Sequence, residues 1–164
     1  MIINMETKRL KITLFKQEYL YDFLEFYNQR ETMKYVASGK SEWSSDELYG
    51  KISSLSGDYP FGVYAVELMT ESKVIGEISV FNSFDSTKKV EIGYIINSEF
   101  HRQGYGYEML SEFIDHLKSQ CGVKIVVARI NSENISSIKL CKKLKFRLSA
   151  VDNIDGKIRQ TYEL

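Results

Sequence analysis

The chain has 164 residues, of which 43% are hydrophobic and 27% are charged, as in an ordinary globular protein. Its 22 basic and 22 acidic residues cancel, which argues against a broad nucleic-acid-binding surface because such a surface needs a basic excess. Two cysteines, no His/Cys cluster, no long apolar run and no signal-peptide layout predict a single cytoplasmic domain over residues 1–164, with no metal and no membrane partner.

The first part of the chain predicts one strand and two helices. Residues 8–15 alternate between polar and apolar side chains, which is typical of a strand. Residues 17–28 have apolar side chains at helical spacing. A second helix is expected over residues 44–55, because Ser44 and Glu47 are the pair that forms a capping box at a helix start.

Three strands and a long helix are expected in the middle of the chain. The strands lie at residues 61–68, 73–81 and 89–97, and the short polar loops between them are typical of hairpins. The helix is expected from Gly104 to about Lys118, since apolar side chains recur every four residues there.

The last part predicts a buried strand at 124–130, a helix at 134–144 and a hairpin formed by 146–153 and 157–164. The element order is therefore β-α-α-β-β-β-α-β-α-β-β. A helix joins the strands at 89–97 and 124–130, so these two strands should be parallel and the others antiparallel. We expect a mixed α/β fold with a twisted, mostly antiparallel central sheet, one parallel crossover and flanking helices.

The start of the helix at Gly104 is unusual. Asp, Glu, Ser or Thr are common at a helix start, because it carries a partial positive charge. Here Arg102 precedes two glycines, Gly104 and Gly106. Exposed amides, glycines and a nearby Arg are typical of a phosphate site. The alternative is a solvated loop with ordinary turn glycines. Neither a P-loop nor a three-glycine dinucleotide motif is present, so these residues indicate only a phosphorylated ligand.

Three segments together resemble a known family. "VEIGYIINSEFHRQGYGYEML" (90–110) resembles the acetyl-CoA-binding motif of the GNAT N-acetyltransferase superfamily. "ETKRLKI" (6–12) resembles the N-terminal strand of that family, and "VARINSENISSIKLCKKLKF" (127–146) resembles its later segment. The "TKRL" opening and "RQTYEL" ending are most similar to the branch that includes ribosomal-protein N-terminal acetyltransferases.

The resemblance implies a GNAT fold whose sheet splays between residues 89–97 and 124–130 to admit acetyl-CoA as co-substrate. It implies that backbone groups of Ile95, Ile96 and Asn97 contact the pantetheine arm and the acetyl carbonyl, and that Asn134 also contacts the pantetheine. The residues that would enclose the pyrophosphate are His101, Arg102, Gln103, Gly104, Tyr105, Gly106 and Tyr107.

Four positions depart from the family pattern. His101 stands where Arg or Gln is usual, and Ser98 stands where proline is common. Lys145 replaces a glycine, and Cys141 occupies a position where many members have a tyrosine acid. Backbone donors do most of the cofactor binding, so the departures at His101 and Lys145 should be tolerated, whereas the departure at Cys141 leaves the identity of the acid open.

Two glutamates are candidate bases for acetyl transfer. A primary amine is mostly protonated at neutral pH, so a base or a water relay would help it to attack. Glu77 and Glu91 lie on adjacent expected strands and should share one face. A half-buried glutamate would have a raised pKa, which suits a base. The alternative for each is a solvent-facing strand residue.

The candidate acids lie on the expected helix at 134–144. Asn134, Ser137 and Cys141 share one face of that helix by their spacing. A thiol protonates a departing thiolate more readily than a serine hydroxyl does, so Cys141 is a candidate acid and Ser137 could position the sulfur or a water. The alternative for Cys141 is a small core residue.

The expected reaction is acetyl transfer from acetyl-CoA to a primary amine by direct attack, in a monomer or a homodimer. The acceptor is a small-molecule amine or a protein N-terminus, and neutral net charge does not choose between them. The competing functions are a non-catalytic acyl-CoA-binding protein and a protein-interaction module of the same fold.

Overall fold

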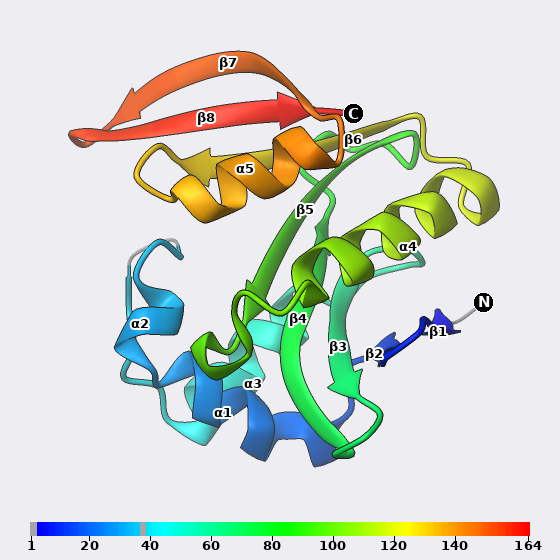
Figure 1. Ribbon diagram of the computed structural model, residues 1–164, viewed down its shortest axis with the longest axis vertical. Coiled ribbons are helices and arrows are strands. Elements are labelled where there is room, and N and C mark those ends of the chain that lie inside the picture. Colours follow the sequence, from blue (N-terminus) through cyan, green and yellow to red (C-terminus); the bar gives the residue numbers. More distant parts are fainter. Residues whose placement is uncertain (1–2, 37–38) are drawn as a thin grey trace.

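A twisted sheet forms the centre of the computed structural model, which describes residues 3–36 and 39–164 (Figure 1). Within these residues the sheet has eight strands in the order β1-β2-β3-β4-β5-β6-β8-β7. The strands are β1 (Asn4–Glu6), β2 (Leu10–Leu14), β3 (Gly62–Leu68), β4 (Lys73–Phe81), β5 (Lys89–Ile96), β6 (Ile125–Asn131), β7 (Arg147–Ile154) and β8 (Lys157–Glu163). Only β5 and β6 pair in parallel, which confirms the predicted mostly antiparallel sheet with one crossover.

Helices cover both faces of the sheet (Figure 1). They are α1 (Leu20–Tyr27), α2 (Arg30–Met33), α3 (Ser45–Ser54), α4 (Tyr105–Gln120) and α5 (Ile135–Lys143), with short 3-10 turns η1 (Gln17–Tyr19) and η2 (Ser98–Phe100). One apolar cluster joins α4 and α5 to the sheet, and a second joins α1 and α3 to the opposite face. None of the helices in the described parts of the chain is long and apolar enough to cross a membrane.

The N-terminal elements differ in detail from the prediction. The strand expected at 8–15 begins at Leu10, and a three-residue strand, β1, precedes it and pairs with it. The helix expected at 17–28 is divided into η1 and α1, and α2 follows after a break at Gln29, whose backbone is extended. Such short elements lack the several periodic positions that make a pattern recognisable.

The sheet opens between β5 and β6. These strands pair only from Lys89↔Ile125 to Ile92↔Ala128, although both continue beyond that point. On its other side β5 stays paired with β4 as far as Gly76↔Ile96. A Cβ atom at Gly76 would overlap the carbonyl oxygen of Ile95, so this close strand contact requires glycine. The expected splay is therefore present, and it lies between β5 and β6.

Candidate active site

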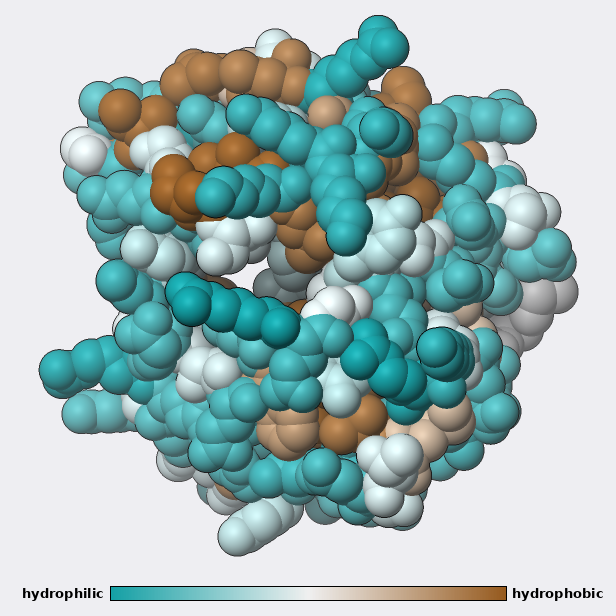
Figure 2. Space-filling model, viewed as in Figure 1, coloured by the Kyte–Doolittle hydropathy of each residue, from teal (hydrophilic) through white to brown (hydrophobic). Residues whose placement is uncertain are grey.

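A cavity of about 540 Å³ lies where β5 and β6 separate. Figure 2 shows the molecule hollowed on this side, with mostly polar side chains around the opening. The cavity brings together five residues that the sequence had singled out: Glu77, Glu91, Ile95, Asn134 and Ser137. It also contains side chains that the sequence did not single out, among them Lys51, Tyr94, Arg129, Lys157 and Arg159.

The turn before α4 has free backbone donors. Arg102 and Gly104 both have left-handed backbones, with φ of 60° and 82°, and Gly104 is the N-cap. Within the described residues, nothing accepts a hydrogen bond from the amides of 103–107, and the Glu108 amide is the first to bond back, to Gly104 O at 3.1 Å. Consecutive free amides at a helix start bind anions, so this turn fits the diphosphate that the resemblance implies.

The side chains of this turn are mostly turned outward. His101, Arg102 and Gln103 are exposed, whereas Tyr105 is buried. A Cβ atom at Gly106 would lie 3.0 Å from Leu140 Cδ2, so glycine lets α4 approach α5 closely. The first turn of α4 is thus fixed by packing while its amides remain open.

Arg9 adds a second guanidinium to this turn, which the sequence analysis did not foresee. Its Nη1 donates to Gln103 O at 2.9 Å, and its guanidinium carbon lies 4.2 Å from the centre of the Tyr105 ring. Its Nε and backbone amide both donate to Glu108 at 2.7 Å, and Thr7 Oγ1 donates to the same carboxylate at 2.6 Å. The "TKRL" segment therefore clamps the start of α4.

Backbone alternation on β5 decides which groups face the gap. The Asn97 amide donates to Ile75 O at 2.8 Å, and its carbonyl accepts from Phe100. Antiparallel strands alternate the direction of their backbone groups, so Ile95 also turns its groups toward β4. Tyr94 and Ile96 turn theirs toward the gap, where the His101 ring nitrogen lies 2.7 Å from Ile96 O. The register of the β4–β5 hairpin would have identified Tyr94 as a residue whose backbone groups face the gap.

Glu77 on β4 is the most deeply buried carboxylate of the cavity, with 3% of its surface exposed. The Tyr27 hydroxyl donates to it at 2.8 Å and the Ser79 hydroxyl at 3.2 Å. Lys51 Nζ in turn donates to the Tyr27 oxygen at 2.9 Å. Burial raises the pKa of Glu77 above its usual value, although Lys51 and the two hydroxyls partly offset the increase.

Glu91 on β5 has a different environment. One of its carboxylate oxygens accepts from the Ser83 hydroxyl at 2.6 Å and from Arg129 Nη1 at 2.8 Å. It is therefore held in an ion pair at the cavity wall. Glu77 and Glu91 lie on one face of the sheet, as expected, but a cation pairs directly only with Glu91.

The start of α5 brings hydroxyl groups to the cavity. Asn134 caps the helix, and its side-chain oxygen accepts from the Ser137 amide at 3.3 Å. Cys141 is fully buried, and its sulfur lies 3.7 Å from the Tyr94 hydroxyl. Burial raises the pKa of the Cys141 thiol to about 11. Ser137 and Tyr94 line the cavity, whereas Cys141 is not among its lining residues and contacts the Tyr94 hydroxyl from the core.

Strand β8 gives the cavity a cationic wall. Lys157 and Arg159 both line it, and no acidic side chain in the described residues forms an ion pair with either. Arg159 Nε is buried and has no hydrogen-bond partner among those residues. A buried donor without a partner costs about 1–3 kcal/mol, so an acceptor group at this position would be strongly favoured.

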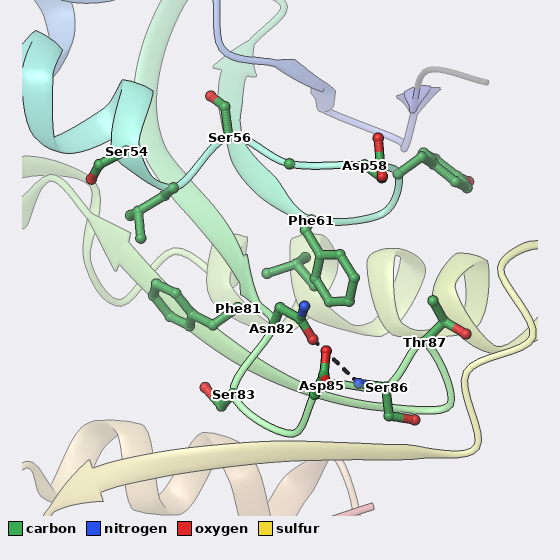
Figure 3. Close-up of a pocket in the computed structure, with 14 residues that line it drawn as sticks. Ser54, Ser56, Asp58, Phe61, Phe81, Asn82, Ser83, Asp85, Ser86 and Thr87 are labelled. Carbon is green, nitrogen blue, oxygen red and sulfur yellow. Dashed lines mark hydrogen bonds between the residues drawn. The ribbon is translucent and has the colours of Figure 1, made fainter.

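A second cavity of about 630 Å³ adjoins the first and shares Leu55 and Phe81 with it. Figure 3 shows it between the segment from Ser54 to Phe61 and the loop from Phe81 to Thr87. In that loop Asn82 Oδ1 accepts from the Ser86 amide at 3.3 Å. Its charged lining residues are Asp58 and Asp85, so its charge is opposite to that of the β8 wall.

The chain was compared with known proteins. Residues 9–147 match the family model described as the acetyltransferase (GNAT) domain. A relative from Bacillus subtilis (strain 168), named "Uncharacterized N-acetyltransferase YnaD", is 25% identical over 145 residues, which cover 88% of this chain and 83% of the relative.

Two solved structures share the fold at low sequence identity. RimL, a ribosomal L7/L12 alpha-N-protein acetyltransferase in complex with coenzyme A, has a TM-score of 0.85 at 14% identity, covering 100% of this chain and 97% of that one. Spermidine N-acetyltransferase from Vibrio cholerae, in complex with CoA and spermine, has a TM-score of 0.82 at 17% identity, covering 95% of both chains. With a family model that spans most of its length, this chain belongs to the GNAT family of acetyltransferases.

Proposed function

We propose that this protein transfers the acetyl group of acetyl-CoA to a primary amine by direct attack. The observation that carries the proposal is the row of amides at residues 103–107, which have no hydrogen-bond partner in the described part of the chain and lie next to the gap between β5 and β6. These amides suit a diphosphate, and the gap leads to a buried carboxylate, Glu77. A ligand that spans the two would place its reactive end near a base.

Binding of acetyl-CoA would use mainly the backbone. The amides of 103–107, with Arg102 and Arg9 beside them, would hold the diphosphate. The backbone groups of Tyr94 and Ile96 would line up with the pantetheine arm, and the side-chain nitrogen of Asn134, Nδ2, which has no partner among the described residues, would be a further donor. The departure at Ser98 leaves these backbone groups in place, whereas the His101 ring nitrogen, 2.7 Å from Ile96 O, would have to release that oxygen to the pantetheine.

Glu77 is the base in this proposal. A primary amine has a pKa near 10 and must lose a proton before or during attack. The raised pKa of Glu77 makes the carboxylate a better proton acceptor at neutral pH, and Tyr27 holds it in place. Acetyl-CoA supplies the acetyl group as a thioester. The amine nitrogen bonds to the carbonyl carbon, and the carbon–sulfur bond breaks. The departing sulfur then takes a proton from the hydroxyl group of Tyr94 or Ser137.

The acceptor has to be inferred from this chain's own residues. Of the two solved structures, one is named for acetylation of a protein N-terminus and the other for acetylation of spermidine. The shared fold therefore supports an amine acceptor in general and does not choose between these classes.

Two measurements test the proposal. Calorimetric titration with acetyl-CoA should give a saturable binding isotherm, and its absence would refute the proposal at the first step. Release of free thiol from acetyl-CoA should then depend on an added amine. The competing function, a non-catalytic acyl-CoA-binding protein, predicts binding without thiol release for every amine offered.

A further inference from the structure

We infer that the amine acceptor is a small molecule carrying a carboxylate or phosphate group, and that Arg159 and Lys157 bind this group. The inference rests on the proposed function and adds the chemical class of its acceptor. It is carried by the charge of the cavity wall formed by β8, and by the buried Arg159 nitrogen that has no partner in the described residues.

The charges that line the cavity do not cancel. Four cationic residues line it, namely Lys51, Arg129, Lys157 and Arg159, against two carboxylates, Glu77 and Glu91. Arg129 is paired with Glu91, and Lys51 donates to Tyr27, which bonds to Glu77. Lys157 and Arg159 of β8 have neither a carboxylate partner nor a hydrogen-bonded link to one among the described residues, so an anionic ligand would neutralise them.

The register of the sheet places Arg159 on the acceptor side. β6 and β8 are neighbours, with Arg129 opposite Thr161 and Asn131 opposite Arg159. Residues two apart on a strand share a face, so Arg129, Asn131, Arg159 and Thr161 lie on one face. Glu91 forms an ion pair with Arg129, so Glu91 lies on this same face. The turn before α4, which would bind the diphosphate, lies on the opposite face of the sheet. Arg159 is therefore not placed to bind the diphosphate of coenzyme A.

The positions of Glu77 and Arg159 also favour an acceptor that carries an amine at one end and an anionic group at the other. Glu77 lies on β4 and Arg159 on β8, at opposite walls of one cavity of about 540 Å³. An amine directed to Glu77 would place a group at its other end near the guanidinium. Arginine binds carboxylate and phosphate through paired donors, so it would both attract and orient such a molecule.

A polycationic acceptor fits this wall poorly. Its second ammonium group would meet Lys157 and Arg159, and like charges repel. The adjoining cavity, with Asp58 and Asp85, is where a second ammonium group could go instead. The two cavities therefore make opposite predictions about acceptor charge, and one experiment can distinguish them.

The test compares matched amines in the thiol-release assay with acetyl-CoA. γ-Aminobutyrate, butylamine and putrescine have the same carbon chain and differ in charge at the far end; α-amino acids and their amides form a second matched set. We expect kcat/KM for the anionic member of each set to exceed that of the neutral member at least tenfold, with putrescine lowest.

Substitution of Arg159 then tests the residue itself. Arg159→Met keeps most of the side-chain length and removes the charge, so the anionic-to-neutral preference should fall about tenfold through a higher KM. Arg159→Lys should keep part of the preference. Arg147→Met, the same change at an exposed position on β7 away from the cavity, should leave the preference unchanged.

The outcomes separate the two claims. If acetyl-CoA is consumed with equal efficiency for all charges, or fastest with putrescine, the inference is wrong and the proposed function stands. If Arg159→Met weakens acetyl-CoA binding by calorimetry, Arg159 is a cofactor ligand and the inference is again wrong. If no amine of any charge releases thiol, the proposed function fails and the inference fails with it.

Discussion

The two sides of the gap between β5 and β6 are constructed differently. The proposed cofactor side comes from one continuous stretch, residues 94–107, and offers mainly backbone groups. The acceptor side is assembled from α1, α3, β4, β5, β6 and β8 and offers side chains, among them Tyr27, Lys51, Glu77 and Arg159. A backbone site depends on local conformation, whereas a side-chain site depends on which residues the fold brings together.

This difference implies different tolerance to substitution. His101 and Ser98 depart from the family pattern, yet the amides of 103–107 remain free of protein partners within the described chain. On the proposed acceptor side the polar side chains are joined to one another by hydrogen bonds. A single substitution there should therefore alter the rate of acetyl transfer or the choice of acceptor.

Glu77→Gln should nearly abolish turnover while leaving acetyl-CoA bound. General-base assistance is worth about 10²–10⁴-fold, so kcat should fall within that range at neutral pH. The loss should shrink at high pH, where the amine is already deprotonated. Thiol release across a pH series measures this, and Glu91→Gln is the matched control, because Glu91 is held by Arg129. A larger loss for Glu91→Gln would assign the base to Glu91.

The same substitution should stabilise the protein. The pKa of Glu77 is raised by burial in the folded state, so the unfolded chain releases this proton at lower pH. The free energy of unfolding therefore falls as pH rises from the ordinary value of 4.5 through the folded value. Glutamine does not ionise, so it avoids this loss of unfolding free energy, which is about 1.4 kcal/mol for each unit by which folding raises the pKa of Glu77. Denaturant unfolding at pH 7 should show Glu77→Gln to be more stable than the parent.

Gly104→Glu should disable the diphosphate turn. A left-handed backbone at φ 82° disfavours a side chain, and a carboxylate there would repel phosphate. We expect acetyl-CoA to bind about a hundredfold more weakly, which is roughly 2.8 kcal/mol. Gly104→Asn is the control, since asparagine tolerates this conformation and is uncharged. Equal losses by calorimetry for both variants would mean that charge at this turn is irrelevant.

The comparison also explains what the sequence could predict. The order of elements along the chain from residue 61 onward, the parallel crossover and the helix start at Gly104 follow from local sequence patterns, and all three are confirmed. Arg159 lies in a strand whose residues look like an ordinary hairpin, and only pairing with β6 brings it to the cavity. Tyr27 lies in a segment whose pattern predicts a helix, but its bond to Glu77 spans fifty residues of chain. Contacts of this range leave no periodic signal.

Glu108→Gln should loosen the clamp on the start of α4. Burial alone would raise the pKa of Glu108, but hydrogen bonds from Thr7 and Arg9 outweigh it and lower the pKa. The carboxylate therefore stabilises the fold above the ordinary value of 4.5 and loses this effect as pH falls through the lowered value. We expect a loss of about 2 kcal/mol at pH 7 and almost none in strong acid. Unfolding of Glu112→Gln, an exposed change on the same helix, should show no such pH dependence.

Ser44→Ala should have the smallest effect, and its effect on function should be limited to the proposed acceptor side. The Ser44 hydroxyl accepts from the Glu47 amide at 3.2 Å, and the Glu47 carboxylate accepts from the Ser44 amide at 2.9 Å. Loss of this cap should lower the free energy of unfolding by about 1 kcal/mol. Ser45→Ala removes an exposed hydroxyl with no such bond and is the control.

The functional consequence of the weaker cap follows from the position of Lys51. It lies in the helix that Ser44 caps, and it reaches Glu77 through the Tyr27 hydroxyl. A looser α3 should therefore raise the acceptor KM a few-fold, while the affinity for acetyl-CoA, which depends on the turn before α4, stays the same. Equal weakening of both ligands would show that the two sides of the gap are coupled through the sheet and are not separate sites.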